Sequence, residues 1–122
     1  MKIKRNTLVS EINESFIQAF PYLKLVFYKK SHGHFVGSMK KDEIDEDVAV
    51  EALNPEIQDG VVEWKGEMSV DKLETYLEES FGLHVQIFRK SGDLWLQTSV
   101  TDHWTLDEQN TNAAQNEKFA TH

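Results

Sequence analysis

The chain contains no cysteine, so disulfide bonds, thiolate metal sites and cysteine nucleophiles are excluded. It also has few residues that break regular structure. Only two prolines and six glycines occur in 122 residues, and the glycines are scattered singly, so no glycine-rich phosphate-binding loop is present. No apolar run approaches the length that a membrane span needs. We expect a cytoplasmic protein without a membrane anchor.

Length and charge set the frame for what is present. A chain of 122 residues is expected to form one domain, and it is long enough to bury about two-thirds of its unfolded surface. The net charge of −8 is unevenly spread. Residues 1–41 hold 8 basic and 2 acidic side chains, a net charge of +6, whereas residues 42–122 hold 5 and 19, a net charge of −14. This asymmetry favours either attraction between two parts of one fold or a basic patch that meets an acidic partner.

The clearest pattern lies between Ser69 and Ser99. Apolar residues at helical spacing predict a helix over 70–81, with Ser69 as its N-cap and Gly82 as the residue that ends it. Strand-like alternation follows over 83–88 and again over 94–98. The turn residues Ser91, Gly92 and Asp93 between these runs predict a β-hairpin.

A fainter copy of this pattern lies near the N-terminus. At an offset of 61 the helix positions match (Val9 with Val70, Ile12 with Leu73, Phe16 with Leu77 and Phe20 with Phe81). At an offset of 60 the strand positions match (Leu23, Leu25 and Phe27 with Leu83, Val85 and Ile87). Neither helix can bury its apolar stripe alone, so the two units are expected to share one core.

These patterns predict an α+β fold of two pseudo-repeated β-α-β-β units, about residues 1–39 and 61–99. The units would share one mostly antiparallel sheet with two helices on one face, in a ferredoxin-like or, alternatively, a β-grasp-like arrangement. Short strands are expected before each helix, over 1–5 and 61–65, and a partner strand over 35–39. Residues 1–109 would form the single domain.

Two segments have no counterpart in the repeat. Residues 40–60 are expected to be a partly ordered acidic connection, because 42–59 hold eight acidic residues and no basic ones. Thr105 and Glu108 have capping-box spacing and predict a short helix. The polar composition of residues 110–122 predicts a disordered tail.

The best candidate site is the sheet face turned away from the helices. If the alternating aliphatic residues face the helices, an aromatic and basic surface faces outward, formed by Tyr28, His84, Gln86, Phe88, Lys90 and Trp95. Exposed aromatic area of this kind is uncommon unless a partner covers it. The competing interpretation is that another part of the chain covers this face and makes it ordinary core.

Other site chemistries are weaker. Aromatic residues on a four-stranded sheet are how some domains bind single-stranded RNA, but residues 32–36 lack the required motif and a charge of −8 opposes phosphate binding. His32 and His34 suit a metal, yet no further ligands can be named. A small-molecule or metal-using enzyme would have to use His84, Asp102 or His103.

The sequence therefore predicts a small binding domain, without catalysis or a cofactor, whose partner is another protein or a second copy of the chain. The aromatic sheet face, centred on Phe88 and Trp95, would form the contact.

Overall fold

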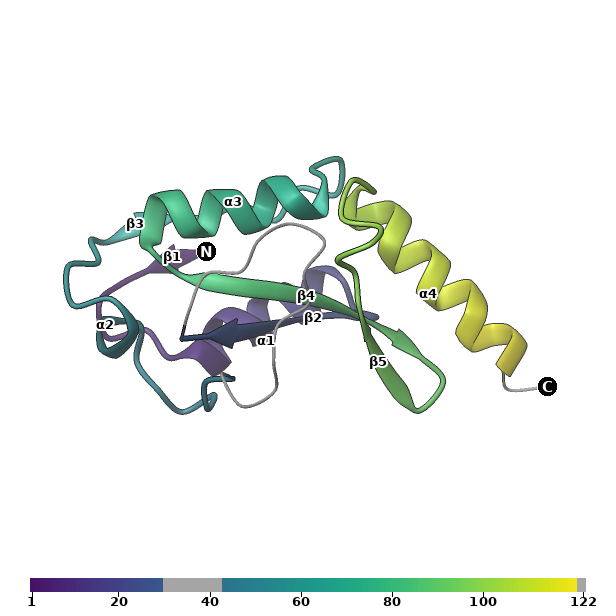
Figure 1. The fold of residues 1–122 in the computed structure, drawn as a ribbon, viewed down its shortest axis with the longest axis horizontal. Coiled ribbons are helices and arrows are strands. Elements are labelled where there is room, and N and C mark those ends of the chain that lie inside the picture. Colours follow the sequence, from purple (N-terminus) through teal and green to yellow (C-terminus); the bar gives the residue numbers. More distant parts are fainter. Residues whose placement is uncertain (30–42, 121–122) are drawn as a thin grey trace.

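The computed structural model describes residues 1–29 and 43–120, which form a mixed α+β fold with antiparallel sheets and four helices (Figure 1). Side chains are described as far as residue 116. The strands are β1 (Lys2–Ile3), β2 (Leu23–Tyr28), β3 (Gly60–Val61), β4 (His84–Ser91) and β5 (Leu94–Gln97). The helices are α1 (Val9–Ala19), α2 (Val50–Leu53), α3 (Val70–Phe81) and α4 (Leu106–Ala120).

Helix α3 confirms the strongest sequence pattern. Its buried stripe consists of Val70, Leu73, Leu77 and Phe81, the residues with helical spacing. Gly82 follows with φ +64°, a left-handed conformation that glycine adopts without the steric cost of a side chain.

The larger sheet has three strands in the order β2-β4-β5, and both pairs are antiparallel. Leu25 of β2 lies directly opposite Ile87 of β4. Strands β4 and β5 form the predicted hairpin, and Gly92 in its turn has φ +59°. The alternation in the sequence therefore correctly placed the central strands.

The strands before the two long helices form a sheet of their own. β1 pairs with β3, with Lys2 opposite Val61 and Ile3 opposite Gly60. The sequence predicted one shared sheet, whereas these strands are only two residues long and lie apart from β2, β4 and β5. Their role is to bring Ile3 and Val62 into the core, where they are 0% and 1% exposed.

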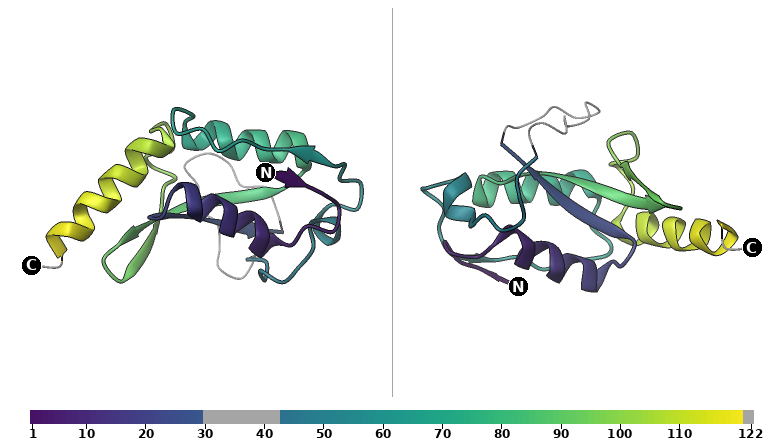
Figure 2. Two further views of the ribbon diagram at one scale, coloured as in Figure 1. Left: turned by 180° about the vertical axis from the view of Figure 1, so that it is seen from behind. Right: turned by 90° about the horizontal axis from the view of Figure 1, so that it is seen from below.

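The core lies between the β2-β4-β5 sheet and helices α1 and α3. Figure 2 shows α1 and α3 on the same side of this sheet, with α4 extending from one end. The apolar stripes of both helices join the inward side chains of the strands in one cluster that includes Phe16, Leu25, Leu77 and Ile87. One sheet face is thereby covered, and the other carries the predicted site.

The connections to the helices are matched in the two halves of the chain. In the first half, Val9 N donates to Val48 O over 2.9 Å, and Val50 N donates to Thr7 O over 2.9 Å. The second half contains the corresponding pair, in which Val70 N donates to Trp104 O and Leu106 N to Met68 O, each over 3.0 Å. Each half therefore binds the start of a long helix to the start of the next helix.

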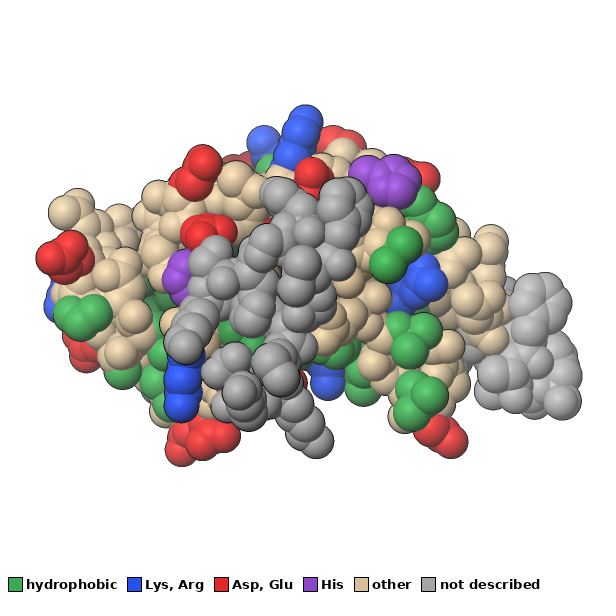
Figure 3. All heavy atoms as spheres, in the orientation of Figure 1, with side chains coloured by type: hydrophobic (Ala, Val, Ile, Leu, Met, Phe, Trp, Pro, Cys, Tyr) green, Lys and Arg blue, Asp and Glu red, His purple; other side chains and the backbone are tan. Residues whose placement is uncertain are grey.

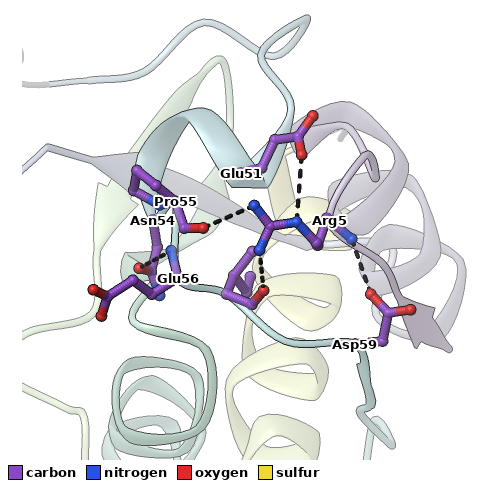
Figure 4. Close-up of polar contacts among 7 residues, drawn as sticks. Arg5, Glu51, Asn54, Pro55, Glu56 and Asp59 are labelled. Atoms are coloured by element: carbon purple, nitrogen blue, oxygen red, sulfur yellow. Dashed lines mark hydrogen bonds and ion pairs between the residues drawn. The ribbon is translucent and has the colours of Figure 1, made fainter.

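The acidic connection is bound to the basic N-terminal segment by Arg5 (Figure 4). The guanidinium donates to Ile57 O and Pro55 O, each over 2.8 Å, and lies 3.6 Å from Glu51. Val50 and Ile57 are buried in the core at 0% and 2% exposure. The part of the connection from residue 43 onward is therefore packed against the fold.

Helix α4 begins at the predicted capping box and runs further than the sequence indicated. Thr105 and Glu108 exchange two hydrogen bonds of 3.1 Å, which confirms the cap. We expected disorder from residue 110, whereas the helix continues to Ala120. The polar composition of this segment did not indicate that it packs against the rest of the chain. It does so through Asn110, whose Oδ1 accepts from Tyr22 N over 2.9 Å, and through Ala113, which is fully buried.

The predicted partner strand over 35–39 lies outside the described residues. Among residues 1–29 and 43–120, no helix has the length and apolar character needed to cross a membrane.

Candidate functional site

All six residues predicted to form the site lie on one face of the β2-β4-β5 sheet. His84, Gln86, Phe88 and Lys90 alternate along β4, so their side chains share a face. The strand pairing adds the other two, because Tyr28 lies opposite His84 and Trp95 lies opposite Lys90. Cross-strand partners have side chains on the same face, and this face is opposite to the one that packs on α1 and α3.

Burial divides these residues into two groups. Tyr28 and Gln86 are buried, at 3% and 6% exposure, whereas His84, Phe88, Lys90 and Trp95 are half-buried. Phe88, Lys90 and Trp95 therefore form a group of half-buried residues toward the β4-β5 hairpin, while His84 lies apart from them at the start of β4.

Lys24 joins the aromatic residues of this group. Its Nζ atom lies 4.6 Å from the ring centre of Trp95 and 5.9 Å from that of Phe88. An ammonium group at these distances is attracted to the electron-rich ring face. We call Lys24, Phe88 and Trp95 the aromatic platform. Each of its side chains comes from a different strand, so the sheet register fixes their arrangement.

The hairpin also exposes apolar side chains on its other face. Leu94 and Leu96 are 66% and 40% exposed, and Val100, in the turn that follows, is 75% exposed. Leu96 lies opposite Arg89 and points to the helix side of the sheet, where the hairpin extends beyond α1 and α3. Figure 3 shows hydrophobic side chains gathered over this end of the molecule, with basic ones beside them.

Two polar groups on the platform face have incomplete partners among the described residues. The Nε2 atom of Gln86 is buried and has no hydrogen-bond partner there. Nδ1 of His84 lies 3.4 Å from Glu78 Oε1, close enough for an ion pair but without hydrogen-bond geometry. Neither group forms part of a recognisable catalytic arrangement.

The candidates for metal binding or catalysis were His32, His34, His84, Asp102 and His103. His32 and His34 lie outside the described residues. The described part of the chain contains no group of three or more metal-ligating side chains placed to hold an ion. Asp102 is buried at 4% exposure, while the adjacent His103 is exposed. A hollow of about 410 Å³ beside α4 is lined by Trp104, Asp107, Glu108, Thr111, Asn112 and Gln115, and therefore by none of the candidate catalytic residues.

The sequence analysis missed two polar residues in the middle of the helices, the buried Asn13 and the half-buried Glu74. Asn13 and Glu74 occupy the same position, 61 residues apart, and each accepts a hydrogen bond from a strand amide. Burial raises the pKa of Glu74 to about 8, and the negative charges of Asp102 and Asp71 add to the shift. The available signal was a polar residue at equivalent places beside two otherwise apolar stripes.

Comparison with known proteins gives no relative for this site: no protein-family model, no curated protein and no solved structure matches the chain.

Proposed function

We propose that the chain is a non-catalytic protein-interaction domain and that its aromatic platform binds an acidic segment of a partner protein. The observation that carries this proposal is the position of Lys24 Nζ, 4.6 Å from the Trp95 ring and 5.9 Å from the Phe88 ring. Lys24 is a half-buried residue, and its ammonium beside two aromatic rings offers charge and apolar area together, which is the composition of interface hot spots.

The charge of the platform favours an acidic occupant. Lys24 and Lys90 lie on this face, while the whole chain carries a net charge of −8. In a two-fold dimer through the platform, the basic surface of one copy would face the same basic surface of the second copy. Like charges at an interface core oppose association. A different protein that supplies carboxylates to the lysines and apolar side chains to the rings fits better.

The proposal is tested with peptides of defined charge. A fluorescein-labelled peptide of alternating glutamate and leucine is titrated with the protein, and anisotropy reports binding; a lysine–leucine peptide and an oligouridine serve as comparisons. We expect only the acidic peptide to bind, and Trp95→Ala and Lys24→Glu to weaken binding about tenfold or more. Circular dichroism of each variant checks that the fold is retained.

Matched variants separate the platform from general effects. Leu94→Ala removes a more exposed apolar side chain from the same hairpin but on the opposite face. Lys72→Glu makes the same charge change as Lys24→Glu at an exposed position of α3. Both controls should bind like the unmodified chain. Equal loss in platform and control variants, absence of peptide binding, or preferential binding of oligouridine would each reject the proposal.

We further infer that the two halves of the chain are repeated units, arranged in a ferredoxin-like or, alternatively, a β-grasp-like manner. Support comes from the matched helix connections, in which Val9 and Val50 correspond to Val70 and Leu106. In this interpretation Phe88 and Trp95 of the platform belong to the second unit, and Lys24 belongs to the first unit.

A further inference from the structure

In both halves of the chain, a polar side chain in the middle of a long helix caps a strand amide. Asn13 Oδ1 of α1 accepts from Leu25 N over 3.0 Å, and Glu74 Oε2 of α3 accepts from Ile87 N over 3.1 Å. Leu25 and Ile87 lie directly opposite each other in the β2-β4 pair. These amides point away from the pair, so each needs an acceptor from outside it.

Each capping side chain has an acidic neighbour from the turn that precedes the next helix. In the first half, Glu46 O accepts from Ser10 N over 2.8 Å, and Glu46 Oε1 accepts from Asn13 Nδ2 over 2.8 Å. In the second half, Asp102 O accepts from Asp71 N over 2.8 Å, the same backbone contact. Asp102 in the second half therefore corresponds to Glu46 in the first half. Its neighbour is Glu74, which corresponds to Asn13.

This exchange changes what the two side chains can do. The amide of Asn13 accepts from the strand and donates to the carboxylate of Glu46. An ionised Glu74 has only acceptor oxygens, and it would add a second negative charge beside the buried Asp102. A protonated Glu74 recovers both functions, because one oxygen accepts and the other carries a proton to donate.

The surroundings favour the protonated form. Asp102 is 4% exposed. Among the described residues, the charged groups that act on Glu74 are Asp71 on its own helix and Asp102 on the turn, both acidic, and β4 contributes the Ile87 amide. Burial makes the largest contribution to raising the pKa of Glu74 to about 8, and the two acidic residues raise it further, while the amide opposes them.

We propose that Glu74 is a neutral carboxylic acid that donates its proton to Asp102, and that this shared proton fastens residues 98–105 and α4 to α3. The attachment also includes the bonds from Val70 N to Trp104 O and from Leu106 N to Met68 O. Loss of the proton places two like charges at this junction and loosens it. The chain thereby contains a pH-sensitive contact in its second half, and the Asn13–Glu46 pair is its counterpart in the first half, with an amide in place of the carboxylic acid.

The sign of the pH dependence follows from the two states of Glu74. Its pKa is about 8 in the folded chain and near the ordinary 4.5 when unfolded, so folding takes up a proton between these values. The stabilisation is complete below about pH 4.5, decreases as the pH rises, and is lost above about pH 8. A carboxylate whose pKa is lowered by folding would show the opposite trend.

Two measurements on the intact chain test the pH-sensitive contact. The carboxyl carbon of Glu74, followed by NMR in the unmodified protein, should titrate near pH 8. Thermal melts are recorded at pH 6 and at pH 9. The decrease in Tm between these two pH values should be at least about 5 °C smaller for Glu74→Gln than for the unmodified chain. Glu79→Gln, at an exposed position of the same helix, should keep the unmodified pH dependence.

Hydrogen exchange identifies the segment that is released. At pH 9 the amides of α4 should exchange about tenfold faster in the unmodified chain than in Glu74→Gln, with no difference at pH 6. The converse variant Asn13→Asp should add a second carboxyl group beside Glu46 and make the stability of the first half more dependent on pH than in the unmodified chain. Titration of Glu74 near its ordinary pKa would overturn the proposal, and so would equal α4 exchange in the two proteins at pH 9.

Discussion

At the scale of single residues, Arg5 contributes through hydrogen bonds to the main chain more than through its charge. Its guanidinium donates to the carbonyls of Pro55 and Ile57, and its own amide donates to Asp59 Oδ1 over 3.2 Å. The ion pair with Glu51 is long, at 3.6 Å, and both side chains are about half exposed. Solvent screens such a pair, so it contributes little.

We therefore expect Arg5→Lys to destabilise the fold although the charge is kept. An ammonium group cannot reach two carbonyl oxygens in the geometry of a planar guanidinium, and the expected loss is about 1 kcal/mol. Urea unfolding, followed by circular dichroism, measures it. Glu51→Gln should cost less than about 0.5 kcal/mol. A larger loss for Glu51→Gln than for Arg5→Lys would mean that charge dominates this contact.

The sequence could not reveal this arrangement. The charge asymmetry suggested attraction between a basic N-terminal part and an acidic connection, and Arg5 does contact that connection. Its main partners, however, are backbone carbonyls of residues 55 and 57. Every residue has a carbonyl, so sequence composition does not identify which ones an arginine will meet.

At the scale of elements, the end of α3 depends on a glycine with two separate roles. Gly82 has φ +64°, and a Cβ atom placed on it would lie 2.5 Å from Nδ2 of Asn54. This same Nδ2 donates to Phe81 O over 2.9 Å, so Asn54 caps the last turn of the helix. A side chain at residue 82 would therefore strain the backbone and displace the cap.

Gly82→Ala should destabilise the chain by about 2 kcal/mol, about half from the left-handed backbone and half from the displaced hydrogen bond. Gly92→Ala is the matched control, because Gly92 has φ +59° and a Cβ atom placed on it would have no neighbour within 4 Å. The control should cost about 1 kcal/mol. Equal losses in urea unfolding would show that Asn54 moves aside without cost.

The extent to which the elements were predictable depended on their periodicity. Helix α3 and the β4-β5 hairpin followed from residue spacing and turn residues. The position-by-position match between strands β2 and β4 of the two repeats did not follow from the sequence. The sequence matched Leu25 with Val85, whereas the capping contacts match Leu25 with Ile87. A shift of two residues leaves strand alternation unchanged, so the pattern assigned the correct face without fixing the position along the strand.

At the scale of the whole molecule, the sequence predicted which residues of the candidate site share a sheet face, but not which of them are accessible to solvent. Alternation placed Tyr28, Gln86, Phe88 and Trp95 together, as the strand register does. It did not distinguish buried from accessible members, because burial depends on long-range packing. Tyr28 and Gln86 are almost fully buried, whereas Phe88 and Trp95, beside Lys24, are half-buried.

The platform and the net charge together predict the association state. The chain carries −8, and Lys24 of the platform and Lys90 on the same face would meet the same basic surface of the second copy in a two-fold dimer. We therefore expect light scattering to give a molar mass of 14.1 kDa, one chain, at low and high protein concentration. The exposed Leu94 and Leu96 are the groups that would oppose this expectation.

The variants at the hairpin assign the cause if a dimer of twice this mass forms. A dimer that dissociates in Trp95→Ala and persists in Leu94→Ala would place self-association on the platform, and the acidic partner would then be excluded by a second copy of the chain. A dimer that dissociates only in Leu94→Ala would use the opposite face of the hairpin. In that case the platform stays accessible, and the peptide titration applies to each subunit of the dimer.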